Sequence, residues 1–145
     1  MRPRPGTYAL VFKTERNKRL VIGKLGILNL QPGYYVYVGS AFGPGGLKAR
    51  IGHHRKTFSR PHWHIDYLSE YLSPVEVWYT FDAAHREDHW SQVLAGIRGA
   101  SIPLPGFGST DCRCRSHLYF FSVRPSNNYF RRKVHAGPDN HARIF

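Results

Sequence analysis

Five side chains between residues 8 and 87 are of the types that phosphodiester cleavage requires. Such cleavage needs a base or a base-assisted water, a positive group on the phosphate and usually a metal ion held by a carboxylate. These types occur here in the order Tyr8, Tyr37, Arg50, His54 and Glu87. Each alone has an ordinary structural explanation, since strand tyrosines pack, helix arginines face solvent and a glutamate favours a helix start. Their order along the chain raises the hypothesis of phosphodiester chemistry.

The two tyrosines belong to short glycine-containing triplets. Tyr8 ends the triplet Gly6-Thr7-Tyr8, and Tyr37 opens the triplet Tyr37-Val38-Gly39. If the strands that carry them pair, the two phenols meet near one edge of a sheet. Gly39 has no Cβ and would allow a backbone or a phosphate to approach closely.

The elements around these residues predict an α+β fold. β-forming runs predict strands over residues 7–13, 20–22, 26–30, 34–39, 75–81 and 117–123, with turn residues between them. Apolar residues at helical spacing predict helices over 47–54, 64–72 and 86–97. We therefore expect one domain over residues 1–124, with a small, mainly antiparallel central sheet flanked by helices. Residues 125–145 are polar and basic, and we expect a loosely ordered C-terminal tail there.

The order of these motifs resembles the GIY-YIG nuclease superfamily. That family has a Gly-Ile-Tyr-like triplet on one strand and a Tyr-Ile-Gly-like triplet on another. A helix with an arginine follows, and then a helix with a metal-binding glutamate. Arg50 in "GGLKARIGHH" matches the arginine, His54 the Tyr or His one turn later, and Glu87 in "HREDHW" the glutamate. The resemblance covers residues 6–97, and "PLPGFGSTDCRCRSHLYFF" resembles small standalone members of unassigned function.

The chain departs from the family pattern at three points. Twenty-eight residues separate Tyr8 from Tyr37, more than in typical members, and we interpret residues 17–33 as an inserted hairpin that widens the sheet edge. Ser40 stands where the DNA-repair members carry a lysine. The C-terminal asparagine of homing-type members has no clear counterpart, and Asp111 and His117 are the candidates for its place.

The resemblance implies a metal-dependent endonuclease that hydrolyses phosphodiester bonds in DNA. Glu87 would hold one Mg²⁺ or Mn²⁺ ion, and Arg50 would bind the scissile phosphate. Tyr8, assisted by Tyr37 or His54, would take the proton from the attacking water. A phenol with a pKa of about 10 is a poor base at neutral pH, so either its pKa is lowered or His54 relays the proton.

Charge supports a nucleic-acid partner. The net charge is +12, and residues 1–60 carry twelve basic residues and one acidic residue, whereas residues 61–100 carry two basic and six acidic ones. Basic surfaces bind polyanions because phosphate contacts release counterions, although such binding is often non-specific. The residues expected to contact nucleic acid are Gly39, Ser40, Lys48, Arg55, Lys56, Arg113 and Arg115.

Two further functions stay open on the same residues. The fold can serve as a nucleic-acid-binding module without cleavage, a reading that Ser40 in the lysine position favours. Aromatic residues near the basic face, such as Tyr34, Phe42 and Phe58, can also stack unpaired bases. The substrate would then be single-stranded DNA or RNA.

Other constellations have weaker support. In "HWHIDY", His64 is a possible catalytic helper, and a capping or core role is an equal alternative. Cys112, Cys114 and His117 lack the four ligands of a structural zinc site. "GPGG" at residues 43–46 is a candidate phosphate cradle, but it lacks the Gly-Lys-Ser/Thr of a nucleotide-binding loop. The cysteine content and the lack of a long apolar run indicate a cytoplasmic protein with no membrane partner.

Overall fold

The fold is described from a computed structural model, in which residues 2–56, 61, 63–108, 115–137 and 142–145 are described. The elements are β1 (Gly6–Thr14), β2 (Lys18–Ile22), β3 (Gly26–Leu30), β4 (Gly33–Ala41), α1 (Gly46–His54), the 3₁₀ helix η1 (His64–Leu68), β5 (Ser73–Thr80), α2 (Glu87–Ala95), β6 (Leu118–Phe121) and α3 (Asn127–His135). This α+β composition confirms the predicted fold class.

The central sheet has four strands in the order β5-β1-β4-β6, and all three pairings are antiparallel. The two strands that carry the glycine-tyrosine triplets are therefore neighbours. The register places Tyr8 opposite Gly39 and Thr7 opposite Ser40. Both strands are largely buried, which explains why they are apolar on both faces.

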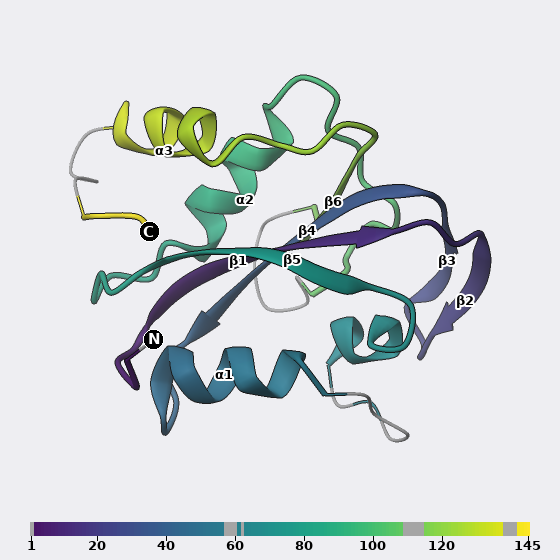
Figure 1. The fold of residues 1–145 in the computed structure, drawn as a ribbon, viewed down its shortest axis with the longest axis horizontal. Coiled ribbons are helices and arrows are strands. Elements are labelled where there is room, and N and C mark those ends of the chain that lie inside the picture. Colours follow the sequence, from purple (N-terminus) through teal and green to yellow (C-terminus); the bar gives the residue numbers. More distant parts are fainter. Residues whose placement is uncertain (1, 57–60, 62, 109–114, 138–141) are drawn as a thin grey trace.

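Each face of the sheet has its own apolar core, because side chains alternate along β1 and β4. Tyr8, Leu10 and Tyr37 point to the face that carries α1 and η1, with buried Leu47 and Leu68. The opposite face carries α2 and α3, and its core includes Val38, Trp78, Trp90 and Phe130. Figure 1 shows α1 on one side of the sheet and α2 with α3 on the other.

The hairpin between the two triplet strands is present, but it does not widen the central sheet. β2 and β3 form a separate two-stranded sheet. Its inner residues, among them Ile22 and Leu28, are fully buried in the core on the α1 face. The prediction of a wider sheet edge was wrong because these apolar residues pack beneath the sheet instead of extending it.

Residues 64–72 form only a short 3₁₀ helix, where a longer helix was predicted. The predicted apolar residues Ile65, Leu68 and Leu72 are all buried. Helical structure ends after Leu68, and β5 begins at Ser73. Leu72 is thus buried without being part of the helix, and the prediction was right about burial and wrong about length.

The C-terminal segment is not a loosely ordered tail, as had been predicted, since it contains α3. The Ser126 hydroxyl accepts a hydrogen bond from the Tyr129 N–H at 3.2 Å and caps the helix. Phe130 and Val134, four residues apart, are fully buried, and the Phe130 ring lies 4.9 Å from Trp78 and 5.0 Å from Trp90, centroid to centroid. The charged residues on the outer face concealed this apolar pair.

Candidate active site

The site is built around the pairing of Tyr8 with Gly39 on β1 and β4. Tyr8 is 1% exposed. A Cβ on Gly39 would overlap the hydroxyl and ring of Tyr8. Gly39 thus makes room for the phenol, and the space that had been assigned to an approaching phosphate is occupied by Tyr8 itself.

Tyr8, Tyr37 and His54 form one aromatic cluster. The Tyr8 Oη lies 2.6 Å from the His54 Nε2, within hydrogen-bonding distance. Ring centroids are separated by 6.5 Å between the two tyrosines and by 5.7 Å between Tyr37 and His54. The prediction that the two phenols come together is therefore confirmed, but its placing of them near a sheet edge was wrong, because β1 and β4 are the two central strands.

Burial sets the protonation states within this cluster. Burial raises the pKa of both Tyr8 and Tyr37. The neighbouring Tyr37 raises the pKa of Tyr8 further. Burial, followed by the charge of His53, lowers the pKa of His54 to about 4. At neutral pH both phenols are protonated and the imidazole is neutral. In the tautomer protonated at Nδ1, the His54 Nε2 accepts the Tyr8 O–H.

Arg50 lies on α1 above the same pair of strands. Its Nη1 donates to the Ser40 carbonyl oxygen at 3.0 Å, and its guanidinium lies 4.3 Å from the centroid of the Trp63 ring. Arg50 and Trp63 also line a pocket of about 240 Å³, together with residues of the glycine loop before α1. Ser40 and Trp63 thus hold the Arg50 side chain in place, and the same side chain borders the pocket.

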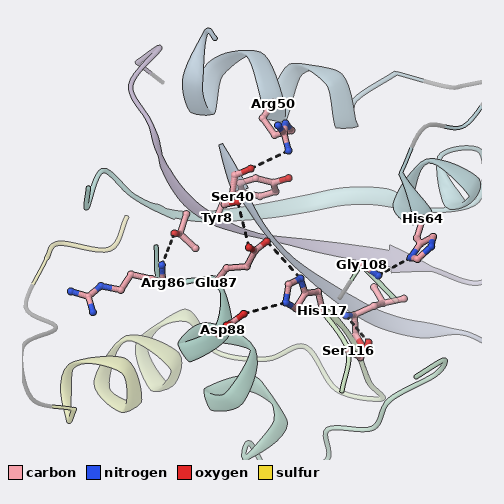
Figure 2. Close-up of polar contacts among 12 residues, drawn as sticks. Tyr8, Ser40, Arg50, His64, Arg86, Glu87, Asp88, Gly108, Ser116 and His117 are labelled. Carbon is pink, nitrogen blue, oxygen red and sulfur yellow. Dashed lines mark hydrogen bonds and ion pairs between the residues drawn. The ribbon is translucent and has the colours of Figure 1, made fainter. Parts of the chain in front are cut away.

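Glu87 approaches from the opposite face of the sheet, as the first residue of α2. The Ser40 hydroxyl donates to the Glu87 Oε1 over 3.5 Å, a long hydrogen bond. β6 pairs with β4 only over Tyr34–Tyr37, so the β4 edge is unpaired with β6 at Ser40. Figure 2 shows Ser40 between Arg50 and Glu87, bonded to both. Ser40 therefore links Arg50 on one face of the sheet to Glu87 on the other, where the sequence had suggested only the loss of a lysine contact.

Thr7 positions the start of α2, a role that the sequence did not reveal. Its side chain is fully buried, and its Oγ1 accepts a hydrogen bond from the Arg86 N–H at 3.3 Å. Arg86 directly precedes Glu87, and its Nε donates to the Asp82 Oδ2 at 2.7 Å. The middle residue of the first triplet thus fixes the residue before the candidate metal ligand. The hydroxyl of Thr7, between the glycine and the tyrosine of the first triplet, was the one feature of the sequence that could have indicated this role.

His117 is the second residue that the site adds. The residue is 2% exposed, and its ring lies beside the first turn of α2. Its Nδ1 is 3.6 Å from the Glu87 Oε2, and its Nε2 is 3.8 Å from the Asp88 Oδ1 (Figure 2). Burial lowers the pKa of His117, so these are contacts of a neutral imidazole at neutral pH. The sequence had suggested His117 only as a substitute for a family asparagine or as part of an incomplete zinc cluster. Asp111, the other candidate, lies outside the described residues.

His64 makes the contacts of a structural residue. The Gly108 N–H donates to its Nδ1 at 2.8 Å, as Figure 2 shows. Its ring lies 5.5 Å from the Phe107 ring, which in turn lies 6.2 Å from Tyr37. Gly108 has a φ of +68°, and a Cβ there would meet Tyr37 and His117. His64 therefore holds the loop behind Tyr37, and the hypothesis of a catalytic helper gains no direct contact.

The glycine loop before α1 serves the backbone and is not an open phosphate cradle. The Gly46 N–H donates to the Gly43 carbonyl oxygen at 3.2 Å, and the Leu47 N–H donates to the Arg4 carbonyl oxygen at 2.9 Å. Gly46 has a φ of +58°, and a Cβ there would overlap Arg4. The first amides of the helix are therefore already bonded within the protein.

The remaining predicted contacts fall into two groups. Lys48, Arg55, Lys56 and Arg115 are exposed, as nucleic-acid contacts require. Arg113, Cys112, Cys114 and Phe58 lie outside the described residues.

Asp66 caps the 3₁₀ helix η1. Its buried carboxylate accepts a hydrogen bond from the Trp63 N–H at 2.9 Å and lies 3.1 Å from the Nε2 of His53, which precedes His54. This arrangement fulfils the capping alternative that had been considered for this segment.

The donor set around Glu87 fits a single hard cation. Within the described ranges, no group of three or more His, Cys, Asp or Glu side chains comes together. Mg²⁺ needs no such cage, since it keeps several waters and is held by one or two carboxylates. The Glu87 side chain is 28% exposed. Burial and then the charge of Asp88 raise its pKa, and a bound cation would offset both effects.

Comparisons with known proteins place the chain by family. A model of a family described as "Domain of unknown function DUF123" matches residues 7–137, a span that includes α3. Curated proteins and solved structures give no match. Among the described residues, no helix has the length and apolar character needed to cross a membrane. Since the match covers most of its length, the chain belongs to the DUF123 family.

Proposed function

We propose that the protein is a metal-dependent endonuclease of the GIY-YIG type that hydrolyses phosphodiester bonds in DNA. One observation carries the proposal: the Tyr8 hydroxyl, in contact with His54, lies on a strand pair that Arg50 contacts from one face and Glu87 from the other. A base, a phosphate ligand and a carboxylate thus come from three separate elements, β1, α1 and α2. The convergence of these three groups on one strand pair is what supports the proposal.

Tyr8 and His54 act as a proton relay in this proposal. The Tyr8 oxygen takes a proton from the attacking water while the phenolic proton passes to the His54 Nε2. Burial raises the pKa of Tyr8, so a free phenolate is disfavoured and a concerted transfer is favoured. Tyr37 packs against the pair and excludes water from its far side.

Arg50 and Glu87 supply the charges. The Arg50 guanidinium borders the open pocket beside α1 and would bind a phosphate oxygen there, opposing the charge that grows in the transition state. Glu87 would hold Mg²⁺ or Mn²⁺, which when bound offers a Lewis acid to the phosphate. The Ser40 hydroxyl orients the Glu87 carboxylate, and the His117 ring packs against the same carboxylate.

Nicking of supercoiled plasmid and cleavage of a labelled single strand, each with Mg²⁺, Mn²⁺ or EDTA, test the proposal. We expect metal-dependent cleavage by the wild type and none by Glu87→Ala. Glu70→Ala removes an exposed carboxylate elsewhere and should cleave normally. Binding without cleavage under any metal would contradict the proposal and favour a binding module, and cleavage of the single strand alone would change the substrate class.

A further inference from the structure

We propose that α3 and the C-terminal segment form a second nucleic-acid site, which binds the phosphate backbone away from the candidate active site. A pocket of about 550 Å³ lies between them. Its lining includes Arg131, Arg132, His135 and Arg143, and none of the residues that line it is acidic. Arginine is the side chain that binds phosphate groups best, because the guanidinium offers several donors in one plane. Three arginines line this one pocket.

This pocket is built by the fold and is not a feature of a mobile tail. Phe130 and Val134 anchor the inner face of α3 in the core. On the outer face, Arg131 donates to the Asn128 Oδ1, one turn earlier. The His135 Nε2 lies 2.9 Å from the Ala142 carbonyl oxygen and so ties the segment that carries Arg143 to the helix. The arginines are thus presented from a fixed scaffold, which lowers the entropic cost of binding.

The C-terminal segment is also fixed at its far end. The Phe145 N–H donates to the Tyr79 carbonyl oxygen at 2.9 Å, and the two rings stack with centroids 5.0 Å apart. The Arg143 guanidinium lies 4.8 Å from the centroid of the Phe145 ring. Arg143 is therefore held between α3 and the edge of β5, with its side chain exposed.

The position of the pocket favours a polynucleotide over a small anion. α3 packs on α2, on the sheet face opposite α1 (Figure 1). A Cβ on Gly137, just after α3, would lie 3.6 Å from the His89 Cε1, two residues beyond Glu87. The exposed Lys48, Arg55 and Lys56 lie on the other face. Two basic surfaces thus flank the end of α2 that carries Glu87, and only a ligand with many phosphates can engage both.

A salt titration of DNA binding tests this inference, which rests on the proposed nucleic-acid partner. The probe is a fluorescent DNA duplex in EDTA, so that cleavage cannot interfere. The variant is Arg131→Gln/Arg132→Gln/Arg143→Gln. Its control is Lys18→Gln/Arg19→Gln/Lys24→Gln, which removes the same charge from exposed hairpin positions. Circular dichroism and thermal unfolding establish that both variants are folded.

We expect the arginine variant to bind about 10-fold or more weakly than the control, with a slope of log Kd against log salt that is smaller by roughly one for each lost phosphate contact. Equal affinities and slopes in the two variants, with tight binding by the wild type, would overturn the second site and leave the proposed function standing. No binding by the wild type would overturn both. The two failures are therefore distinguishable.

Discussion

The Tyr8 hydroxyl lies 2.6 Å from the His54 Nε2, although 46 positions separate the two residues in the sequence. β1 supplies the phenol, which is buried, and α1 supplies the imidazole, which is half-buried. Burial shifts the two pKa values in opposite directions, so both groups are neutral at pH 7. A neutral donor and a neutral acceptor at this distance form a path for one proton.

Removal of the Tyr8 hydroxyl should slow cleavage strongly and preserve DNA binding. Tyr8→Phe keeps the ring that packs over Gly39 but removes the oxygen that would take the proton, and general-base catalysis typically contributes 10²–10⁴-fold. We expect a nicking rate lower by about that factor, with an unchanged Kd for the duplex. Tyr35→Phe, which removes another hydroxyl from a buried tyrosine, is the matched control. Normal nicking by Tyr8→Phe would remove Tyr8 from the mechanism.

A methyl group at Gly39 should destabilise the protein and displace Tyr8. The added Cβ would overlap the Tyr8 ring, which is buried and has no room to retreat. Overpacking of this kind costs about 1–3 kcal/mol. Urea unfolding of Gly39→Ala should show this loss. Gly43→Ala, where a Cβ meets no atom within 4 Å, should unfold like the wild type. Equal stabilities for the two variants would mean that the Tyr8 ring does not occupy the space over Gly39.

His54 should make the stability of the protein depend on pH below neutrality. Burial lowers its pKa to about 4 from an ordinary value of 6.5, so the unfolded chain binds its proton more readily than the folded one. The contribution to stability is complete above pH 6.5 and is lost as the pH falls toward 4. Between pH 7.5 and 5 we expect the wild type to lose about 1–2 kcal/mol more of its free energy of unfolding than His54→Gln.

Urea titrations at the two pH values measure this difference. His85→Gln, which removes an exposed imidazole, serves as the control for the loss of a histidine. If His54→Gln loses as much stability on acidification as the wild type, protonation of His54 does not cause the loss of stability at low pH.

Thr7 should control the position of Glu87 through the backbone. Thr7→Val preserves the buried volume but removes the oxygen that accepts the Arg86 N–H. Loss of a side-chain acceptor at a helix start costs about 0.5–2 kcal/mol. We expect this destabilisation in urea together with a higher metal concentration for half-maximal nicking, because the carboxylate is less well placed to hold the metal. Thr7→Ser should restore the metal dependence. Failure of this rescue would indicate that the methyl group, and not the hydroxyl, matters at this position.

The strands and two of the helices were predictable because local pattern and tertiary packing agree there. Leu47 and Ile51 recur at helical spacing and are buried, and the apolar run of β4 is buried on both faces. The C-terminal helix was missed because its signal is only two residues, Phe130 and Val134, among five charged or amide side chains and a histidine. Their burial depends on Trp78 and Trp90, which lie far away in the sequence.

For the candidate site, residue types and order were visible in the sequence, but partners were not. Gly39 was assigned to the ligand, whereas its neighbour across the strand pair fills the space. Ser40 was interpreted as the loss of a lysine, and the structure makes it the bridge between Arg50 and Glu87. Strand register decides both outcomes, and register is set by the whole sheet and not by either triplet.

The division of the site between the two faces of the sheet means that the site is complete only when both faces are covered. A chain that ends after α1 already holds Tyr8, Tyr37, Arg50 and His54, yet it lacks α2 and β6. Glu87 and His117 contact the site from the second face of the sheet, which α2 and α3 cover. Partly folded or nascent chains are therefore harmless to nearby nucleic acid if the proposed chemistry holds, and nicking activity reports on completion of the fold.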